Sequence, residues 1–453
     1  MSKETANKAC GTCESTQCGT SCESCGVETQ DHVVFTEDMM DYTILVPTML
    51  PMHFKIMTGI MRSFGYNTVL LENYDSSVIE YGLKYVHNDT CYPALLVIGQ
   101  MLSAIESGKY DTNKLALMIT QTGGGCRASN YIFLLRKALK KAGYGHIPVI
   151  SLNFAGLEKG SAFKLTVPLV LRLLYAVMLG DLLMLIKNQC LPYEVNAGDT
   201  ERVCDKWVQR LTVEMASTGK IRYADVKRFY REILNDFAAI PMSGERKVRV
   251  GIVGEIFVKF SPLGNNELEK FLLSEDAEVV MPGLLDFCMF SCHNSVTDAK
   301  LLGMRKGKGF IFNIALKFFE KKQKDLIEAI RLHGRFDPPT PFAHVIDLAD
   351  GLISHGAKMG EGWLLTAEMA ELIEEGVNNI VCAQPFGCLP NHIVGKGMMK
   401  PLREKYPSSN IVAVDYDAGA TKINQENRIK LMLSNARSAA ASADRKADSE
   451  VRI

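Results

Sequence analysis

The sequence lacks an excess of charge of either sign. Its 51 Lys and Arg residues are matched by 51 Asp and Glu residues, so the formal net charge at neutral pH is zero. Proteins that bind nucleic acids or anionic membrane surfaces normally carry a basic excess. We therefore expect neither a nucleic acid nor a membrane among the partners of this chain.

A secretory signal and a clear membrane span are also missing. The N-terminus, MSKETANKAC, is polar, and the one long apolar run, 165–186, contains Arg172 and Asp181. Each of these charges costs roughly 2.5–3.5 kcal/mol near the centre of a bilayer. We interpret the run as a buried helix and expect a soluble, cytoplasmic protein, whose thiols stay reduced. The 13 cysteines then favour metal or redox chemistry over disulfides.

The common catalytic and nucleotide motifs are absent as well. There is no HExxH and no GxSxG, and the glycine pair at 251–254 lacks the third glycine of a dinucleotide fingerprint. His344, His355 and His392 stand alone in the sequence and are interpreted as core or surface histidines. Any dependence on ATP must then come from a partner protein.

What the chain does have is a repeated alternation of strand-like runs and helical spacing. The strand-like runs occupy 43–49, 67–72, 115–120, 147–154, 248–256, 277–283, 378–384 and 410–416. This rhythm predicts an α/β fold with parallel sheets. We expect two flavodoxin-like or Rossmann-like lobes, 31–245 with a helical insertion and 246–435, followed by a flexible or frayed helical tail at 436–453. The cleft between such lobes is the expected place for a site.

Three cysteines share one local context, at the start of a helix that follows a strand or a polar turn. They are Cys91, Cys126 and Cys388, and Cys126 follows the glycine turn Gly123, Gly124 and Gly125. Turns after parallel strands gather at one sheet edge, so these thiols are expected to meet in one cleft. Helix N-termini and glycine-turn amides stabilise thiolates and approach a bulky cluster closely. If they bind a [4Fe–4S] cluster, three thiolates would leave one of its irons open. The alternative interpretation is that the three cysteines are small buried apolar residues.

The remaining cysteines of the two lobes give weaker signals. Cys382 lies inside a strand, where a core role is favoured, and we keep it as a further candidate ligand. Cys288 and Cys292 allow either role. Cys190 and Cys204 have helical surroundings and are expected to be inert.

The first thirty residues form a separate Cys-rich arm with few large apolar side chains. Two CxxC pairs, Cys10 with Cys13 and Cys22 with Cys25, have the spacing of zinc or iron–sulfur ligands. We interpret them as a second candidate metal site, which would also organise the arm. A redox-sensitive, flexible tail is the alternative.

Six segments together resemble the 2-hydroxyacyl-CoA dehydratase component family. They are NDTCYPALLVIGQ, TQTGGGCRASNYI, GEIFVKFSPLGNNELEKFL, VMPGLLDF, GEGWLLTAEM and QPFGCLPNHIVGKG. The resemblance covers roughly 35–433 and is strongest to the related C-terminal region of acyl-CoA dehydratase activase proteins. It implies flavodoxin-like lobes that hold a [4Fe–4S] cluster, with Cys91, Cys126 and Cys388 as ligands.

The resemblance also implies a partner and a reaction. The partner is an ATP-hydrolysing iron–sulfur activator that delivers a low-potential electron, and the reaction is the anaerobic radical dehydration of a 2-hydroxyacyl-CoA. Arg127 and Asn130 are expected to contact anionic or carbonyl groups of an acyl-CoA substrate, or else to be solvent-facing helix residues. The dehydratases use two different subunits, whereas this is one chain with an added arm, so the substrate stays open. We expect an oligomer.

The sequence also allows three functions besides dehydration. Related double-cubane cluster proteins reduce small molecules at two bridged [4Fe–4S] units, which would want six thiolates. The two lobes offer six, at Cys91, Cys126, Cys288, Cys292, Cys382 and Cys388. A second hypothesis is a non-catalytic electron relay, with the arm as a second electron port. A third is a structural zinc protein.

Overall fold

The computed structural model describes residues 32–451 except 88–89, 122–124, 154–160, 218, 220 and 304–305. The arm with Cys10, Cys13, Cys22 and Cys25 lies outside the described residues, as do Gly123 and Gly124. The predicted roles of these residues therefore stay predictions.

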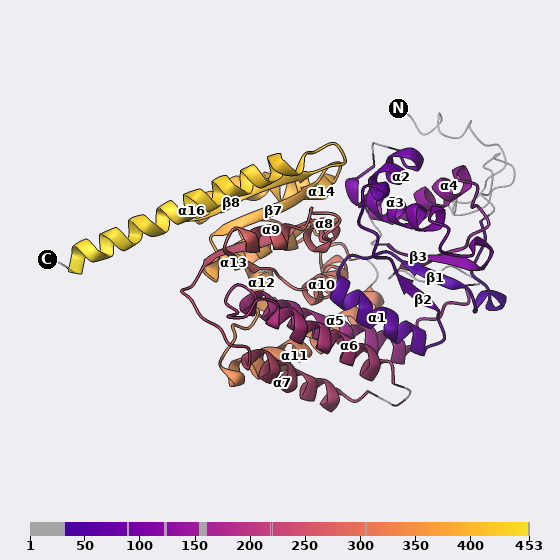
Figure 1. The fold of residues 1–453 in the computed structure, drawn as a ribbon, viewed down its shortest axis with the longest axis horizontal. Coiled ribbons are helices and arrows are strands. Elements are labelled where there is room, and N and C mark those ends of the chain that lie inside the picture. Colours follow the sequence, from indigo (N-terminus) through magenta and orange to yellow (C-terminus); the bar gives the residue numbers. More distant parts are fainter. Residues whose placement is uncertain are drawn as a thin grey trace.

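Two four-stranded sheets, each with all its strands parallel, form the two lobes (Figure 1). The first sheet has the order β2-β1-β3-β4, with β1 Thr43–Val46, β2 Thr68–Leu70, β3 Leu115–Gln121 and β4 Val149–Asn153. The second has the order β6-β5-β7-β8, with β5 Val248–Gly254, β6 Ala277–Val280, β7 Asn379–Pro385 and β8 Asn410–Tyr416. This confirms the predicted α/β fold with two flavodoxin-like or Rossmann-like lobes. Counted from its own first strand, each sheet has the order second, first, third, fourth.

Five predicted strands are shorter in the structure than in the sequence pattern, and proline gives the reason for two of them. The run from 43 ends as a strand at Val46, directly before Pro47, and the run from 277 ends at Val280, shortly before Pro282. Proline has no backbone N–H to donate to the ladder, so pairing stops near it.

The helices of the first lobe cover its sheet and include one close helix pair. They are α1 Pro51–Ser63, α2 Ser77–Tyr85, α3 Tyr92–Glu106 and α4 Tyr131–Lys141, with short 3-10 turns η2 Glu37–Met39, η3 Thr112–Lys114 and η4 Arg127–Asn130. Gly99 of α3 packs against α2, where a Cβ would collide with the Val78 carbonyl oxygen. This glycine lets α3, which is buried along nearly its whole length, approach α2 closely.

The predicted insertion forms three helices below the sheets in Figure 1, α5 Val167–Cys190, α6 Asp199–Met215 and α7 Tyr223–Ala238. Within the part of the chain that the structure describes, α5 is the one helix long and apolar enough to span a membrane. About two thirds of its most apolar 18-residue segment is buried inside the protein. Arg172 donates from its guanidinium to the carbonyl oxygens of Met215 and Ser217 at 3.0 and 2.7 Å. These features fit the predicted core helix of a soluble protein.

The second lobe carries helices on both faces of its sheet and one long terminal helix. They are α8 Ile256–Phe260, α9 Leu268–Ser274, α10 Leu284–Leu301, α11 Lys306–His333, α12 Phe342–Ala349, α13 Trp363–Glu374, α14 Leu389–Val394, the turn η5 Lys396–Met398, α15 Met399–Lys405 and α16 Lys422–Val451. The last of these, α16, extends away from the two lobes (Figure 1) and includes most of the Ala- and Ser-rich tail.

Asp181 of α5 joins the two lobes. Its carboxylate lies 2.8 Å from Nε2 of His53 on α1 and accepts the backbone N–H groups of Leu284 and Leu285 at 2.9 and 2.8 Å. The carboxylate thereby caps the N-terminus of α10 while pairing with the first lobe. Gly283 leaves room for this contact, because a Cβ there would lie 2.7 Å from Asp181 Oδ2.

Candidate functional site

Each of the three cysteines singled out in the sequence is the residue immediately before a helix. Cys91 caps α3, Cys126 caps η4 and Cys388 caps α14, all three with extended backbone angles. We call Cys91, Cys126 and Cys388 the cysteine trio. Pro93 and Pro390 occupy the first turns of α3 and α14, where a missing N–H costs nothing.

Direct contacts between the lobes bring Cys91 and Cys388 together. The backbone N–H of Tyr92 donates to the carbonyl oxygen of Phe386 at 3.0 Å. Gly387 has φ +74°, and a Cβ there would lie 3.2 Å from the Cα of Cys91. The residues next to Cys388 therefore pack against the backbone of Cys91, and a side chain at Gly387 would push the lobes apart.

The Cys126 turn also reaches the second lobe. The backbone N–H of Gly125 lies 3.0 Å from Sδ of Met359, in the loop that precedes α13. The next residue of that loop, Gly360, approaches Pro390 of α14, with only 3.2 Å between its missing Cβ position and the proline Cβ. One loop of the second lobe thus contacts both the Cys126 turn and the helix that Cys388 caps.

The charges of the trio act on one another. The pKa of the Cys91 thiol is raised to about 11, chiefly by burial and to a smaller extent by Glu255 and Cys126, against the lowering effect of the hydrogen bonds to Tyr131 and the Ala94 N–H. Burial, then Glu361, Glu255 and Cys126, raise the pKa of Cys388 well above its ordinary value. Cys126 therefore lies within electrostatic range of both Cys91 and Cys388, and the burial of the latter two disfavours free thiolates. A metal that binds thiolate must compete with protons here.

Two carboxyls and a phenol complete the surroundings of the trio. The Tyr131 hydroxyl lies 2.9 Å from Sγ of Cys91. Glu255 caps α8 by accepting the Val258 N–H at 2.9 Å, and Glu361 accepts the Ile256 N–H at 3.0 Å. Burial raises the pKa of Glu255 to about 8, and the neighbouring Glu361 adds to the rise. At neutral pH the pair can therefore hold a proton beside the thiols.

The sequence pattern did not single out Glu255 or Glu361. Both lie in segments that carry the family resemblance, GEIFVKF and GEGWLLTAEM, yet an isolated Gly-Glu pair has no spacing that points to a site. Arg127 and Asn130 lie on or beside η4, directly after Cys126, and both are exposed. Their predicted contacts with a substrate stay a prediction.

The other candidate cysteines lie elsewhere. Cys382 is fully buried inside β7, and its thiol is influenced by Asp415, Glu368 and Lys396 rather than by the charges around the trio. Cys288 and Cys292 lie one turn apart on α10, and Cys288 is influenced by Asp181 and Asp286. The structure does not bring these three thiols to the trio, so it offers no support for a six-thiolate cluster.

The two cysteines expected to be inert are buried in the helical layer. Cys190 is fully buried at the end of α5, and the Cys204 thiol of α6 lies 3.1 Å from Sδ of Met52. Both positions match small apolar residues in a core, which makes Cys204 a suitable control for the trio.

The donor set of the trio fits a cluster better than a single ion. Among the described residues, no group of three or more His, Cys, Asp and Glu side chains is arranged to hold one metal ion. A cubane makes a different demand, because each cysteine binds a separate iron and the sulfurs stand farther apart. The trio supplies three helix-capping thiols from two lobes, with Gly125 and Gly387 beside two of them, which is the kind of donor that such a cluster takes.

Comparison with known proteins gives no family for this chain. No protein-family model matches it, and no curated protein matches it at a significant level. The function is therefore argued from the geometry of the site together with the resemblance of the six segments.

Proposed function

We propose that this is an iron–sulfur protein of the 2-hydroxyacyl-CoA dehydratase type, in which Cys91, Cys126 and Cys388 hold a [4Fe–4S] cluster. The observation that supports the proposal most is the meeting of three helix-capping cysteines, two from the first lobe and one from the second. When bound, the cluster would supply a low-potential electron and one open iron for a substrate oxygen.

The residues of the chain have separate tasks in this proposal. The Tyr131 hydroxyl, 2.9 Å from Sγ of Cys91, and the N–H groups at the start of α3 offset part of the burial that raises the pKa of this thiol. Glu255 and Glu361 hold a proton within range of the trio, which loss of a hydroxyl group as water requires. The burial of Cys91 and Cys388 keeps bulk water from the reacting centre.

The electron would come from a partner protein. The chain has no nucleotide motif of its own, so an ATP-hydrolysing iron–sulfur activator is the proposed donor. The substrate class is an acyl-CoA with a hydroxyl next to the carbonyl, or a small molecule reduced in a related reaction. We place the protein in the cytoplasm, where thiols stay reduced.

The first test measures bound iron. After anaerobic reconstitution, wild-type protein should hold at least about four irons per chain with matching sulfide. Cys126→Ser should lose about that amount, while Cys204→Ser, at a buried thiol of the helical layer, should lose none. The N-terminal arm adds the same background to all three proteins. Equal iron in the two variants would contradict the choice of ligands.

A second test addresses the reaction. Electron paramagnetic resonance of the reduced protein should change when a 2-hydroxyacyl-CoA is added, because a substrate oxygen on the open iron alters its spin state. With the activator and ATP, the protein should then turn the substrate over. An unchanged spectrum without turnover would favour the electron relay over the enzyme.

A further inference from the structure

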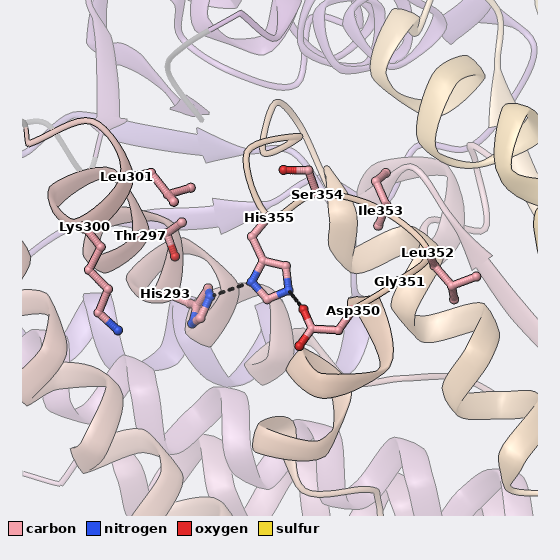
Figure 2. Close-up of a pocket in the computed structure, with 10 residues that line it drawn as sticks. All are labelled: His293, Thr297, Lys300, Leu301, Asp350, Gly351, Leu352, Ile353, Ser354 and His355. Carbon is pink, nitrogen blue, oxygen red and sulfur yellow. Dashed lines mark hydrogen bonds and ion pairs between the residues drawn. The ribbon is translucent and has the colours of Figure 1, made fainter.

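Two histidine rings meet beside an open pocket that has no part in the proposed cluster site (Figure 2). The pocket has a volume of about 620 Å³ and lies between the C-terminal half of α10 and the loop after α12. His293 and Lys300 come from α10, while Asp350 and His355 come from the loop. His355, which is isolated in the sequence, is therefore paired in the fold.

The distance between the two rings is informative. Nε2 of His293 lies 3.3 Å from Nδ1 of His355. That is longer than the roughly 2.9–3.0 Å of a favourable hydrogen bond from nitrogen. Two imidazole nitrogens bound to one tetrahedral zinc ion, each at about 2.0–2.1 Å, stand about 3.3–3.4 Å apart. The observed spacing is that of a long hydrogen bond between the rings and equals the separation that a shared metal ion requires.

The surroundings hold the rings in this arrangement. Nε2 of His355, the nitrogen away from His293, lies 3.3 Å from Oδ1 of Asp350. This contact is an ion-pair distance without a hydrogen bond, so Asp350 acts on the His355 ring through its negative charge. The His355 ring stacks on buried Trp363 with 4.8 Å between centroids, and His293 meets the same indole edge-on at 5.3 Å. The indole N–H of Trp363 is itself fixed by Asn294 at 3.0 Å.

The charges around the pair also bear on what can bind. Asp298, near Lys300 on α10, is paired with Lys358, and Asp350 is mostly exposed. The positive charge of Lys300 repels a cation bound by the two histidines, and the negative charge of Asp350 offsets part of that repulsion. Lys300 also favours an anion as a further ligand of the bound cation.

We propose that His293 and His355 together bind a divalent transition-metal ion of the zinc class, with Asp350 as an outer partner of His355. Only two protein atoms ligate the ion, so its other positions face the pocket and take water or an anionic ligand near Lys300. Imidazole suits zinc, nickel and copper, and open positions are typical of sites that bind a ligand. The proposal shares no residue with the cysteine trio and does not depend on the cluster.

Zinc counting by equilibrium dialysis of the full chain tests the site. His293→Gln and His355→Ala should each bind one zinc ion fewer per chain than wild type. Asp350→Asn should keep the site with about 10- to 100-fold weaker affinity, as expected for an outer partner. His344→Ala is the control, since His344 is exposed and pairs with Glu374 at 3.3 Å away from the pocket. The cysteines bind the same background zinc in all variants, so equal zinc in wild type and both histidine variants overturns the proposal.

Cobalt in place of zinc identifies the lost ligands. The spectrum of wild type minus His293→Gln should show cobalt bound by nitrogen and oxygen, without thiolate charge-transfer absorption. Thiolate absorption in that difference would mean that the lost metal belonged to cysteines, which also overturns the proposal. His293→Gln keeps a side chain that can hydrogen-bond to His355, and Asp350→Asn changes an exposed group. These two variants decide the question if His355→Ala does not fold.

Discussion

The two lobes have the same strand order, yet they place different residues at matching positions around the site. In each sheet the third strand, β3 or β7, is followed by a capping cysteine, Cys126 in the first lobe and Cys388 in the second. The helix before the third strand is α3 in one lobe and α13 in the other. Cys91 caps α3, whereas Gly362, preceded by Glu361, caps α13.

The comparison explains why the trio has three members. Of the four matching capping positions, three carry a thiol and the fourth carries a glycine next to a buried carboxyl. A cluster held by the trio would have three protein ligands, and the fourth capping position, next to Glu361, would offer it no thiol. That is the arrangement that the proposed open iron needs.

The largest expected effect tests whether Cys126 and Cys388 are equivalent. Cys388→Ser should lose as much iron as Cys126→Ser after anaerobic reconstitution, because each removes one of three ligands. Cys382→Ser, six residues earlier in β7, should keep wild-type iron, because its thiol lies in the apolar core. Iron and acid-labile sulfide per chain are the measurements. Loss of iron in Cys382→Ser but not in Cys388→Ser would mean that Cys388 does not match Cys126 as a ligand.

The next effect concerns Asp181, the residue that links the first lobe to α10 of the second. Asp181→Ala should lower the free energy of unfolding by about 3–5 kcal/mol, because it removes the buried partner of His53 and the cap of α10. Denaturant unfolding followed by circular dichroism measures it. Asp205→Ala, at an exposed position of α6, should change stability by less than about 0.5 kcal/mol. Equal stability of the two variants would show that Asp181 does not join the lobes.

A pH experiment examines the carboxyl side of the site. The pKa of Glu255 is raised by burial to about 8 from an unfolded value of 4.5. Between these values the folded metal-free protein binds the proton that the unfolded chain releases. The protonated Glu255 carboxyl therefore contributes its full share to the free energy of unfolding below pH 4.5. This contribution is lost as the pH rises towards 8, at roughly 1 kcal/mol per pH unit.

Glu255→Gln should remove this loss. The stability of the variant, measured by urea unfolding from pH 5 to 8.5, should fall less steeply with pH than that of wild type. Glu404→Gln, at an exposed carboxyl of α15, is the matched control and should follow the wild-type curve. Parallel curves for wild type and Glu255→Gln would mean that Glu255 is not protonated beside the trio.

Much of the fold was predictable because it follows from local chemistry. The strand at 410–416 was predicted to the residue, since it is rich in Ile and Val and contains no proline, while the run from 43 was too long because Pro47 ends the ladder. The rule that βα turns share one sheet edge predicted one cleft for the trio, but Cys126 and Cys388 follow strands of two different sheets, and the rule does not place two sheets relative to each other. The Glu255–Glu361 pair and the His293–His355 pair could not be predicted, because residues 62 to 106 positions apart meet only through tertiary packing.

The smallest expected effect concerns Gly362, the capping position that has no cysteine although the matching position of the first lobe is Cys91. Gly362 has φ +51°, and a Cβ there would collide with the Ala357 carbonyl oxygen and lie 2.6 Å from the Cα of Lys358. Gly362→Ala should therefore cost about 2–3 kcal/mol of stability. Gly376 is the control, because its φ of +79° is equally unfavourable for alanine but nothing lies within 4 Å of its Cβ position. Gly376→Ala should cost about 1 kcal/mol, the backbone term alone. Thermal unfolding measures the stability lost by each variant. Equal losses in Gly362→Ala and Gly376→Ala would mean that the loop before α13 can move to accept a side chain at position 362. In that case the backbone would not be the reason why this position has no cysteine.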